Sequence, residues 1–139
     1  MNNKEIVRRF SIVLWEQRDL SIIDELFIAE PMIRSPLNPA KGCLSMREIA
    51  ERWLEAFPDI AITWLDFIAE NDKVVSRWFA RGTHLGSFFD TRPTHKEVSY
   101  SGVTTFVLQD QKIVEYAALV DIHSILKQLG VASLAEAID

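Results

Sequence analysis

The stretch KVVSRWFARGTH, residues 73–84, decides the fold because its side chains change character with a period of two. Successive side chains of a β-strand point to opposite faces of a sheet, so the stretch predicts a strand with two different faces. One face carries Val74, Ser76, Trp78, Ala80, Gly82 and His84, and the other carries Val75, Arg77, Phe79 and Arg81. We expect the first set, which is smaller and less charged, to line a concave interior.

Further long strands are expected on both sides of this stretch. They are IAITWLDFIAE at 60–70, VSYSGVTTFVLQD at 98–110 and KIVEYAALVD at 112–121. Asn71 with Asp72, and Asp110 with Gln111, are turn-forming pairs between neighbouring strands. The second half of the chain therefore predicts antiparallel hairpins.

Helical spacing of apolar side chains dominates the first half of the chain. Residues 3–16 show this period after a cap at Asn2 or Asn3. A shorter helix is expected at 20–27, capped either by Asp19 or by the pair of Ser21 and Asp24. These two helices predict a helical hairpin.

A loop and a third helix follow. MIRSPLNPAKG, residues 32–42, combines proline, asparagine and glycine, which indicates a short extended segment and then a loop. Ser45 and Glu48 form a capping box, and the helix that it starts should end before Pro58.

Helices followed by a sheet are typical of the α+β class. With 139 residues, of which 48% are hydrophobic, we expect one domain spanning 1–139 with one core. Three N-terminal helices would pack on a strongly curved, mixed and mainly antiparallel sheet, with a short C-terminal helix. The concave face would be filled by side chains or by a ligand.

Composition bears on the partners and the compartment. The formal charge of −5 and the scattered 15 Lys and Arg argue against nucleic acid as a partner. MNNKEIVRRF, residues 1–10, mixes charges into its start and reads as neither a signal peptide nor a membrane span, so we expect a cytoplasmic protein. Cys43 is the one cysteine and is expected to be a loop thiol.

Asp121 is the first candidate for chemistry because it ends the apolar run that begins at Tyr116. It could cap the helix expected at 122–129, or it could lie in a pocket that controls its ionisation, or both. If Asp121 faces the interior, Leu119 and Ala117 do too, whereas Tyr116 faces the other way.

A carboxylate that works as an acid or base needs a hydrogen-bond donor for the oxygen of its substrate. His84 at the end of its strand is one candidate, and Arg34 is another if its extended segment lines the mouth of the pocket. The three histidines are too widely spaced for a metal motif, so no metal is expected.

Aromatic side chains are numerous for this length, with four tryptophans at 15, 53, 64 and 78. They can be ordinary core residues or parts of a binding pocket. The opposite sheet face, with Arg77, Phe79 and Arg81, is part apolar and part charged. Such a face suits the contact of a homodimer.

Several strings occur in one order at compatible spacing. They are AFPDI at 56–60, RGTHLGSF at 81–88, RPT at 92–94, KIVEY at 112–116 and D-x-x-x-x-L-x-Q-L-G at 121–130. Together they resemble the SnoaL-like polyketide cyclase and ester cyclase family. The resemblance implies an NTF2-like cone around an apolar pocket, often in dimers or tetramers. It also implies cofactor-free aldol ring closure of a polyketide ester, with Asp121 as general acid/base.

The chain departs from the family pattern around that acid. Val107 stands where the family carries a basic residue, and Leu119 replaces a polar neighbour of the aspartate. Ala117 replaces a tryptophan, and Arg34 replaces a histidine. A site with these residues is expected to be drier than those of the family's cyclases.

Two functions follow as hypotheses. The first is a cofactor-independent enzyme that cyclises or isomerises an apolar, oxygenated small molecule, with Asp121 and His84 as catalytic residues. Its substrate-binding residues would be Arg34, Trp15, Trp53, Trp78, Phe57, Val107, Leu119 and Thr105. The second is a module of the same fold that binds a small molecule or a partner protein without turnover.

Overall fold

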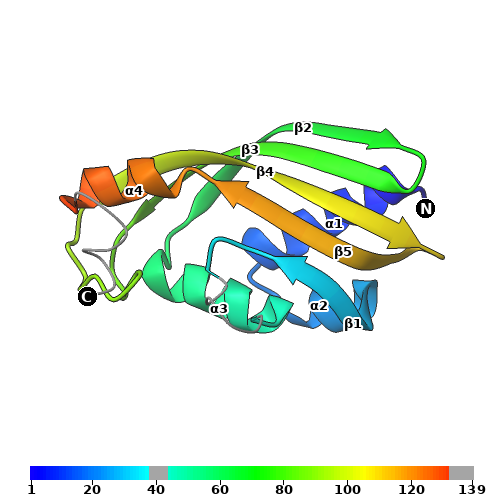
Figure 1. Ribbon diagram of the computed structural model, residues 1–139, viewed down its shortest axis with the longest axis horizontal. Helices are drawn as coiled ribbons and strands as arrows, with labels where there is room; N and C mark the ends of the chain where they lie inside the picture. Colours follow the sequence, from blue (N-terminus) through cyan, green and yellow to red (C-terminus); the bar gives the residue numbers. More distant parts are fainter. Residues whose placement is uncertain (38–43, 132–139) are drawn as a thin grey trace.

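The computed structural model describes residues 1–37 and 44–131 and forms one curved sheet with helices beneath it (Figure 1). The five strands run in the order β1-β5-β4-β3-β2. Their bounds are β1 Phe27–Arg34, β2 Ala61–Glu70, β3 Lys73–Thr83, β4 Glu97–Gln109 and β5 Lys112–Val120. β1 pairs with β5 in parallel and the other pairs are antiparallel, which confirms a mixed, mainly antiparallel sheet.

Three helices, α1, α2 and α3, lie on one side of the sheet, and α4 lies at one end of it (Figure 1). Their bounds are α1 Asn3–Trp15, α2 Ser21–Leu26, α3 Met46–Ala56 and α4 Ile122–Leu129. No helix of the described residues is long and apolar enough to cross a membrane. The predicted α+β class with helices packed on a curved sheet is confirmed.

The helix starts follow local side-chain chemistry. The hydroxyl of Ser45 accepts a hydrogen bond from the amide of Glu48, and the carboxylate of Glu48 accepts one from the amide of Ser45, so the predicted capping box is present. Asn2 makes the same kind of box at the start of α1. At α2 the N-cap residue is Leu20, which makes no side-chain cap, and the carboxylate of Asp19 before it accepts from the amide of Ser21 at 3.0 Å.

The turns between strands use residues that tolerate a left-handed backbone. Asn71 has a φ of 54°, and Asp110 and Gln111 have φ values of 50° and 65°. They close the β2–β3 and β4–β5 hairpins, as predicted from the sequence. Cys43 lies outside the described residues.

The core lies between the concave face of the sheet and the helices. The alternation predicted for β3 is confirmed, because Val74, Ser76, Trp78, Ala80 and Gly82 are all buried while Arg77, Phe79 and Arg81 are exposed. Phe10 of α1 meets Phe106 of β4 edge-on, with ring centroids 5.9 Å apart. These contacts fix which face of each strand is interior.

The orientation expected for β5 is wrong. Tyr116 is 5% exposed and lies opposite Phe106 on the concave face, whereas Leu119 is 77% exposed. Residues paired across a sheet point to the same face, so buried Phe106 fixes Tyr116 as interior. The period of two then turns Ala117 and Leu119 outward.

Candidate functional site

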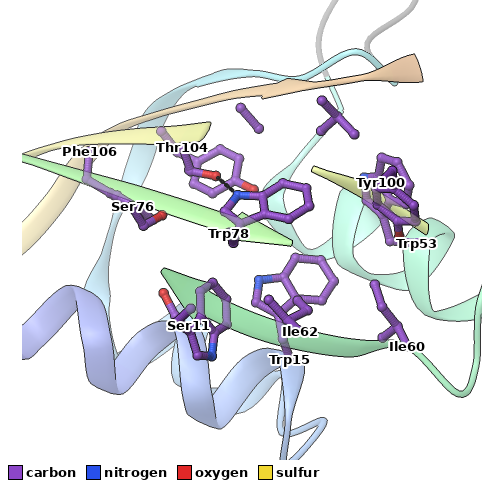
Figure 2. A pocket seen from close by; sticks show the side chains of 14 residues that line it. Ser11, Trp15, Trp53, Ile60, Ile62, Ser76, Trp78, Tyr100, Thr104 and Phe106 are labelled. Carbon is purple, nitrogen blue, oxygen red and sulfur yellow. Dashed lines mark hydrogen bonds between the residues drawn. The ribbon is translucent and has the colours of Figure 1, made fainter. Parts of the chain in front are cut away.

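An aromatic cavity lies between the concave face of the sheet and helices α1 and α3 (Figure 2). The volume open to the centre of a water molecule is about 40 Å³. The true space extends one water radius further at every wall, so it suits a molecule of one or two small rings. The lining comprises Ser11, Trp15, Trp53, Ile60, Ile62, Trp64, Ser76, Trp78, Tyr100, Thr104, Phe106, Tyr116, Ala118 and Val120.

Stacked aromatic rings form one end of the cavity. Trp53 of α3 stacks on Tyr100 of β4, with ring centroids 5.8 Å apart and planes inclined by 25°. Trp78 of β3 meets Tyr100 edge-on at 6.0 Å. Gly102 makes room for Trp78, because a Cβ at that position would come within 2.3 Å of the indole ring.

Hydroxyl groups form the polar part of the lining. The indole Nε1 of Trp78 donates to Oγ1 of Thr104 at 3.0 Å, as the dashed line in Figure 2 shows. Ser76 lies opposite Thr104 in the β3–β4 ladder, and both side chains are buried. The hydroxyl of Ser11 donates to the carbonyl of Val7 at 2.8 Å.

Two phenols complete the polar groups. Burial raises the pKa of Tyr116, and the neighbouring Thr104 hydroxyl lowers that pKa in part. Burial also raises the pKa of Tyr100, and the charge of Asp59 adds to this rise. Both phenols therefore keep their protons at neutral pH and can donate hydrogen bonds.

The described part of the lining is electrically neutral. It contains no carboxylate, imidazole, amino or guanidinium group. A charged ligand would lose its water shell in this cavity without gaining an opposite charge, which is costly. The arrangement therefore favours an apolar, uncharged ligand with a few oxygen atoms.

Asp121 lies outside this lining and is exposed. It is the cap of α4, where a carboxylate oxygen accepts a hydrogen bond from the amide of Ser124 at 3.1 Å. Asp121 therefore caps the helix, which is one of its two predicted roles. The other prediction, a position inside the pocket, is wrong. The physical reason is the strand period, which places Val120 in the cavity and turns the next residue away from it.

His84 is fully buried but does not belong to the cavity lining. Its Nδ1 accepts from the amide of Thr94 at 3.1 Å and lies 3.0 Å from the Thr94 hydroxyl. Burial lowers the pKa of His84, while the nearby backbone of Gly86 and Thr91 acts in the opposite direction. His84 therefore anchors the loop after β3, and its expected place in the pocket as a donor to the substrate oxygen is wrong.

The other predicted binding residues divide into two groups. Trp15, Trp53 and Trp78 lie in the cavity lining, and their role in binding stays a prediction. Phe57 is fully buried behind the lining, with its ring centroid 6.0 Å from that of Trp53. Phe57 can support Trp53 but does not face the cavity.

The remaining three lie elsewhere. Arg34 is exposed at the end of β1 and borders an outer groove together with Glu48. Thr105 is exposed and Val107 is half-buried, and both point to the convex face of β4, because Thr104 and Phe106 point inward. Arg34 is therefore not in the pocket. The expected pocket positions of Thr105 and Val107 are wrong because the strand period turns these side chains outward, as it does Leu119.

Most of the polar lining is not predicted by the sequence. The strand period places Ser76 on the concave face without giving it a role, and Ser11, Thr104, Tyr100 and Tyr116 are not among the predicted binding residues. A usable signal was present in β4, where Tyr100, Gly102, Thr104 and Phe106 recur with a period of two. Among the described residues, no group of three His, Cys, Asp or Glu side chains could hold a metal ion.

The model of the SnoaL-like polyketide cyclase family matches residues 5–129. The chain belongs to this family. The match covers every described helix and strand except the first residues of α1. The predicted NTF2-like fold and family resemblance are thereby confirmed.

Solved structures agree with the family assignment. AclR from Streptomyces galilaeus, a candidate hydroxylase, is 27% identical with a TM-score of 0.78, over 92% of this chain and 84% of AclR. IdmH from Streptomyces antibioticus, a candidate polyketide cyclase, is 26% identical with a TM-score of 0.74, over 94% and 100%. TsrD from Streptomyces laurentii has a TM-score of 0.80 at 21% identity, over 94% and 96%.

No curated protein matches the chain. The family and its structures support a cyclase-like role. One of these relatives is a candidate hydroxylase and another a candidate polyketide cyclase. The reaction of this chain must therefore be argued from its own cavity.

Proposed function

We propose that the protein acts on an apolar, oxygenated small molecule in the aromatic cavity, by cofactor-independent cyclisation or isomerisation. The observation that carries the proposal is the largely apolar, uncharged lining with its few hydroxyl groups. Ligand sites of this kind are largely apolar, and a small number of polar groups fix the orientation of the ligand.

The polar groups of the cavity suit one part of such a reaction. Ring closure next to a carbonyl builds negative charge on the carbonyl oxygen, and fixed donors lower the free energy of that state. Thr104, Tyr100 and Tyr116 are the buried hydroxyls for this task, and that of Tyr100 has no hydrogen-bond partner among the described residues. The described lining contains no carboxylate or imidazole to accept the proton that leaves carbon.

The missing base favours a second candidate function. A cavity that holds donors but no general base can bind a small molecule without converting it. This second candidate is a binding module of the same fold, with the same class of ligand. The two candidates differ in turnover and not in the place of binding.

Filling the cavity tests both candidates. In Ala118→Leu a larger side chain projects into the cavity, whereas in Ala117→Leu the same change points to the convex face. We expect a panel of neutral aromatic keto esters to bind wild type and Ala117→Leu but not Ala118→Leu, measured by calorimetry. Equal binding to all three proteins would contradict the cavity as the site.

Mass spectrometry of the same mixtures separates the two candidates. Cyclisation with loss of water lowers the product mass, and isomerisation changes the retention time at constant mass. Product that forms with wild type and Ala117→Leu but not with Ala118→Leu supports the enzyme. Binding without product across the panel supports the binding module.

We also propose that the protein forms a homodimer through the convex face of the sheet. Ile68, Phe79 and Leu119 are 54%, 38% and 77% exposed on this face, which is unusual for large apolar side chains. Arg77 pairs with Asp66 at the edge of this face. Light scattering should give twice the chain mass, and Leu119→Arg should halve it, whereas a monomeric wild type contradicts the proposal.

A further inference from the structure

A second hollow lies outside the aromatic cavity, where α1 runs beside β2. This outer groove has a volume open to the centre of a water molecule of about 490 Å³. Trp64 lines both the groove and the cavity, so its indole is a wall that the two spaces share. The groove is lined by Lys4, Arg8, Ile12, Trp64, Leu65, Asp66 and Phe67.

Hydrogen bonds tie α1 to β2 at both ends of the outer groove. At one end the side-chain amide of Asn3 donates to the carbonyl of Asn71 at 3.3 Å. At the other end the guanidinium of Arg18 donates to the carbonyls of Pro58 and Ile60, at 2.9 and 3.1 Å. Because both ends are fixed, the helix and the strand keep their separation along the groove.

A β-bulge gives the outer groove its aromatic floor. Leu65 is the extra residue of β2, since Trp64 and Asp66 pair with neighbouring residues of β3. The bulge turns Phe67 to the same face as Trp64, and their ring centroids lie 5.7 Å apart. In an unbroken strand, residues three positions apart would point to opposite faces.

Two cations border this floor on the helical side. The guanidinium of Arg8 lies over the ring of Phe67, with its Cζ 5.1 Å from the ring centroid. A guanidinium over an aromatic ring keeps N–H groups at its edge that can bind a carboxylate. Lys4 lies one helical turn before Arg8 on the same side of α1. Among the described residues, neither Lys4 nor Arg8 makes an ion pair.

The carboxylates nearest to these cations have other partners. Asp66 pairs with Arg77. Glu16 accepts from an indole N–H at 3.1 Å, and Glu5 belongs to the capping box of α1. Like charges one turn apart on a helix repel each other, so an anion that binds between them is stabilised.

We propose that the outer groove binds a flat, apolar molecule that carries a carboxylate. Its ring would lie against Trp64 and Phe67, and its carboxylate would bind between Lys4 and Arg8. The site is separate from the cavity of the proposed function and does not rest on it. It takes a charged ligand, which the uncharged cavity disfavours.

Two probes of nearly equal shape test the charge selection. 1-Naphthoate is an anion at neutral pH, and 1-naphthamide is uncharged. We expect wild type to bind 1-naphthoate about twofold to tenfold more tightly than 1-naphthamide in calorimetric titrations, the range of one or two exposed ion pairs. Arg8→Gln should remove most of this preference and Lys4→Gln part of it. Equal affinity of wild type for both probes would overturn the proposal.

Arg9→Gln is the matched control. It makes the same substitution at the next residue of α1, whose side chain pairs with Glu25 and does not line the outer groove. We expect it to retain the preference for 1-naphthoate. Loss of the preference in Arg9→Gln as well as in Arg8→Gln would show that net charge holds the anion, and this would contradict the groove as its site.

Nuclear magnetic resonance locates the bound probe. The chain has four tryptophans, so four indole N–H signals are expected, and Trp64→Phe and Trp78→Phe assign two of them. 1-Naphthoate should move the Trp64 signal, because that indole forms part of the groove, and leave the Trp78 signal in place. A moved Trp78 signal with an unchanged Trp64 signal would put the probe in the cavity and overturn the proposal.

The variant that fills the cavity separates the two sites. Ala118→Leu should bind 1-naphthoate as wild type does, because Ala118 lines the cavity and not the outer groove. Retained binding in Ala118→Leu, together with a preference lost in Arg8→Gln, supports the groove whether or not keto esters bind in the cavity. Loss of 1-naphthoate binding in Ala118→Leu would overturn the groove as a separate site.

Discussion

The two faces of β3, β4 and β5 are built from alternate residues of the same strands yet carry different chemistry. The concave face presents Trp78 and Thr104 to an uncharged, largely apolar cavity. The convex face presents Phe79, Thr105 and Leu119 to solvent. A shift of one position along a strand therefore decides whether a side chain can meet a ligand in the cavity.

The same difference accounts for the position of Asp121. It follows the outward-facing period of β5, and its carboxylate accepts from the amide of Ser124. The inward positions next to it hold Ala118 and Val120 instead. We therefore place the proposed chemistry at the hydroxyls of the concave face.

Removal of the central indole should give the largest contrast between the faces. Trp78→Ala leaves a cavity and removes the donor to Thr104, so we expect the free energy of unfolding to fall by about 3–5 kcal/mol. Phe79→Ala, one position away, should cost about 1 kcal/mol because its side chain is 38% exposed. Urea unfolding of both variants checks the contrast, and equal losses would contradict it.

A smaller loss is expected when the space beside the indole is filled. A Cβ at Gly102 would lie 2.3 Å from the ring of Trp78 and 2.7 Å from the carbonyl oxygen of Leu119. Gly102→Ala should therefore cost about 1–3 kcal/mol in unfolding free energy. Near-ultraviolet circular dichroism should show the displaced indole.

Ser101→Ala provides the control for this change. Ser101 is exposed on the convex face at the next position of β4. We expect its unfolding free energy and near-ultraviolet spectrum to remain those of wild type. A Gly102→Ala protein with an unchanged indole spectrum would show that the ring is not held as described.

The strand with the clearest alternation was also the most predictable part of the chain. In β3 small or apolar side chains alternate with arginines, so the concave set could be read from the sequence. The capping box of Ser45 and the turn at Asn71 were likewise predictable, because each depends on residues within a few positions.

The site was less predictable because its geometry depends on pairing between strands. The run from Tyr116 to Val120 is apolar throughout, so its own sequence does not reveal which residues face inward. The pairing of Tyr116 with Phe106 settles the question. The hydrogen bond from Trp78 to Thr104 joins residues 26 positions apart, so no local sequence pattern predicts it.

Asp121 should affect stability and not the ligand. Asp121→Ala removes the cap of α4, so we expect a loss of about 1 kcal/mol in unfolding free energy. Asp121→Asn should restore most of it, because asparagine caps helices about as well as aspartate. Binding of the aromatic keto esters should be unchanged in both variants, and its loss in Asp121→Asn would place the acid in the site.

The smallest effect that we expect is a pH dependence from His84. Burial holds the pKa of His84 below its ordinary value of 6.5, so the unfolded chain takes up a proton more readily than the folded one. Stability should therefore fall as the pH drops through 6.5 towards 5. The carboxylates with lowered pKa values act in the same direction, but only at lower pH.

Two histidine variants isolate this effect. His84→Gln can keep an acceptor for the amide of Thr94 and should flatten the dependence of unfolding free energy on pH between 7 and 5. His123→Gln, at an exposed position of α4, should retain the wild-type slope. Identical slopes in wild type and His84→Gln would contradict the assignment.

A crystal structure of the protein soaked with an aromatic keto ester tests the central claim most directly. The account predicts electron density for the ligand between the concave face and α1, with its ketone oxygen within hydrogen-bonding distance of the Thr104, Tyr100 or Tyr116 hydroxyl. Ligand density on the convex side next to Asp121 and Leu119, with the aromatic cavity empty, would contradict it.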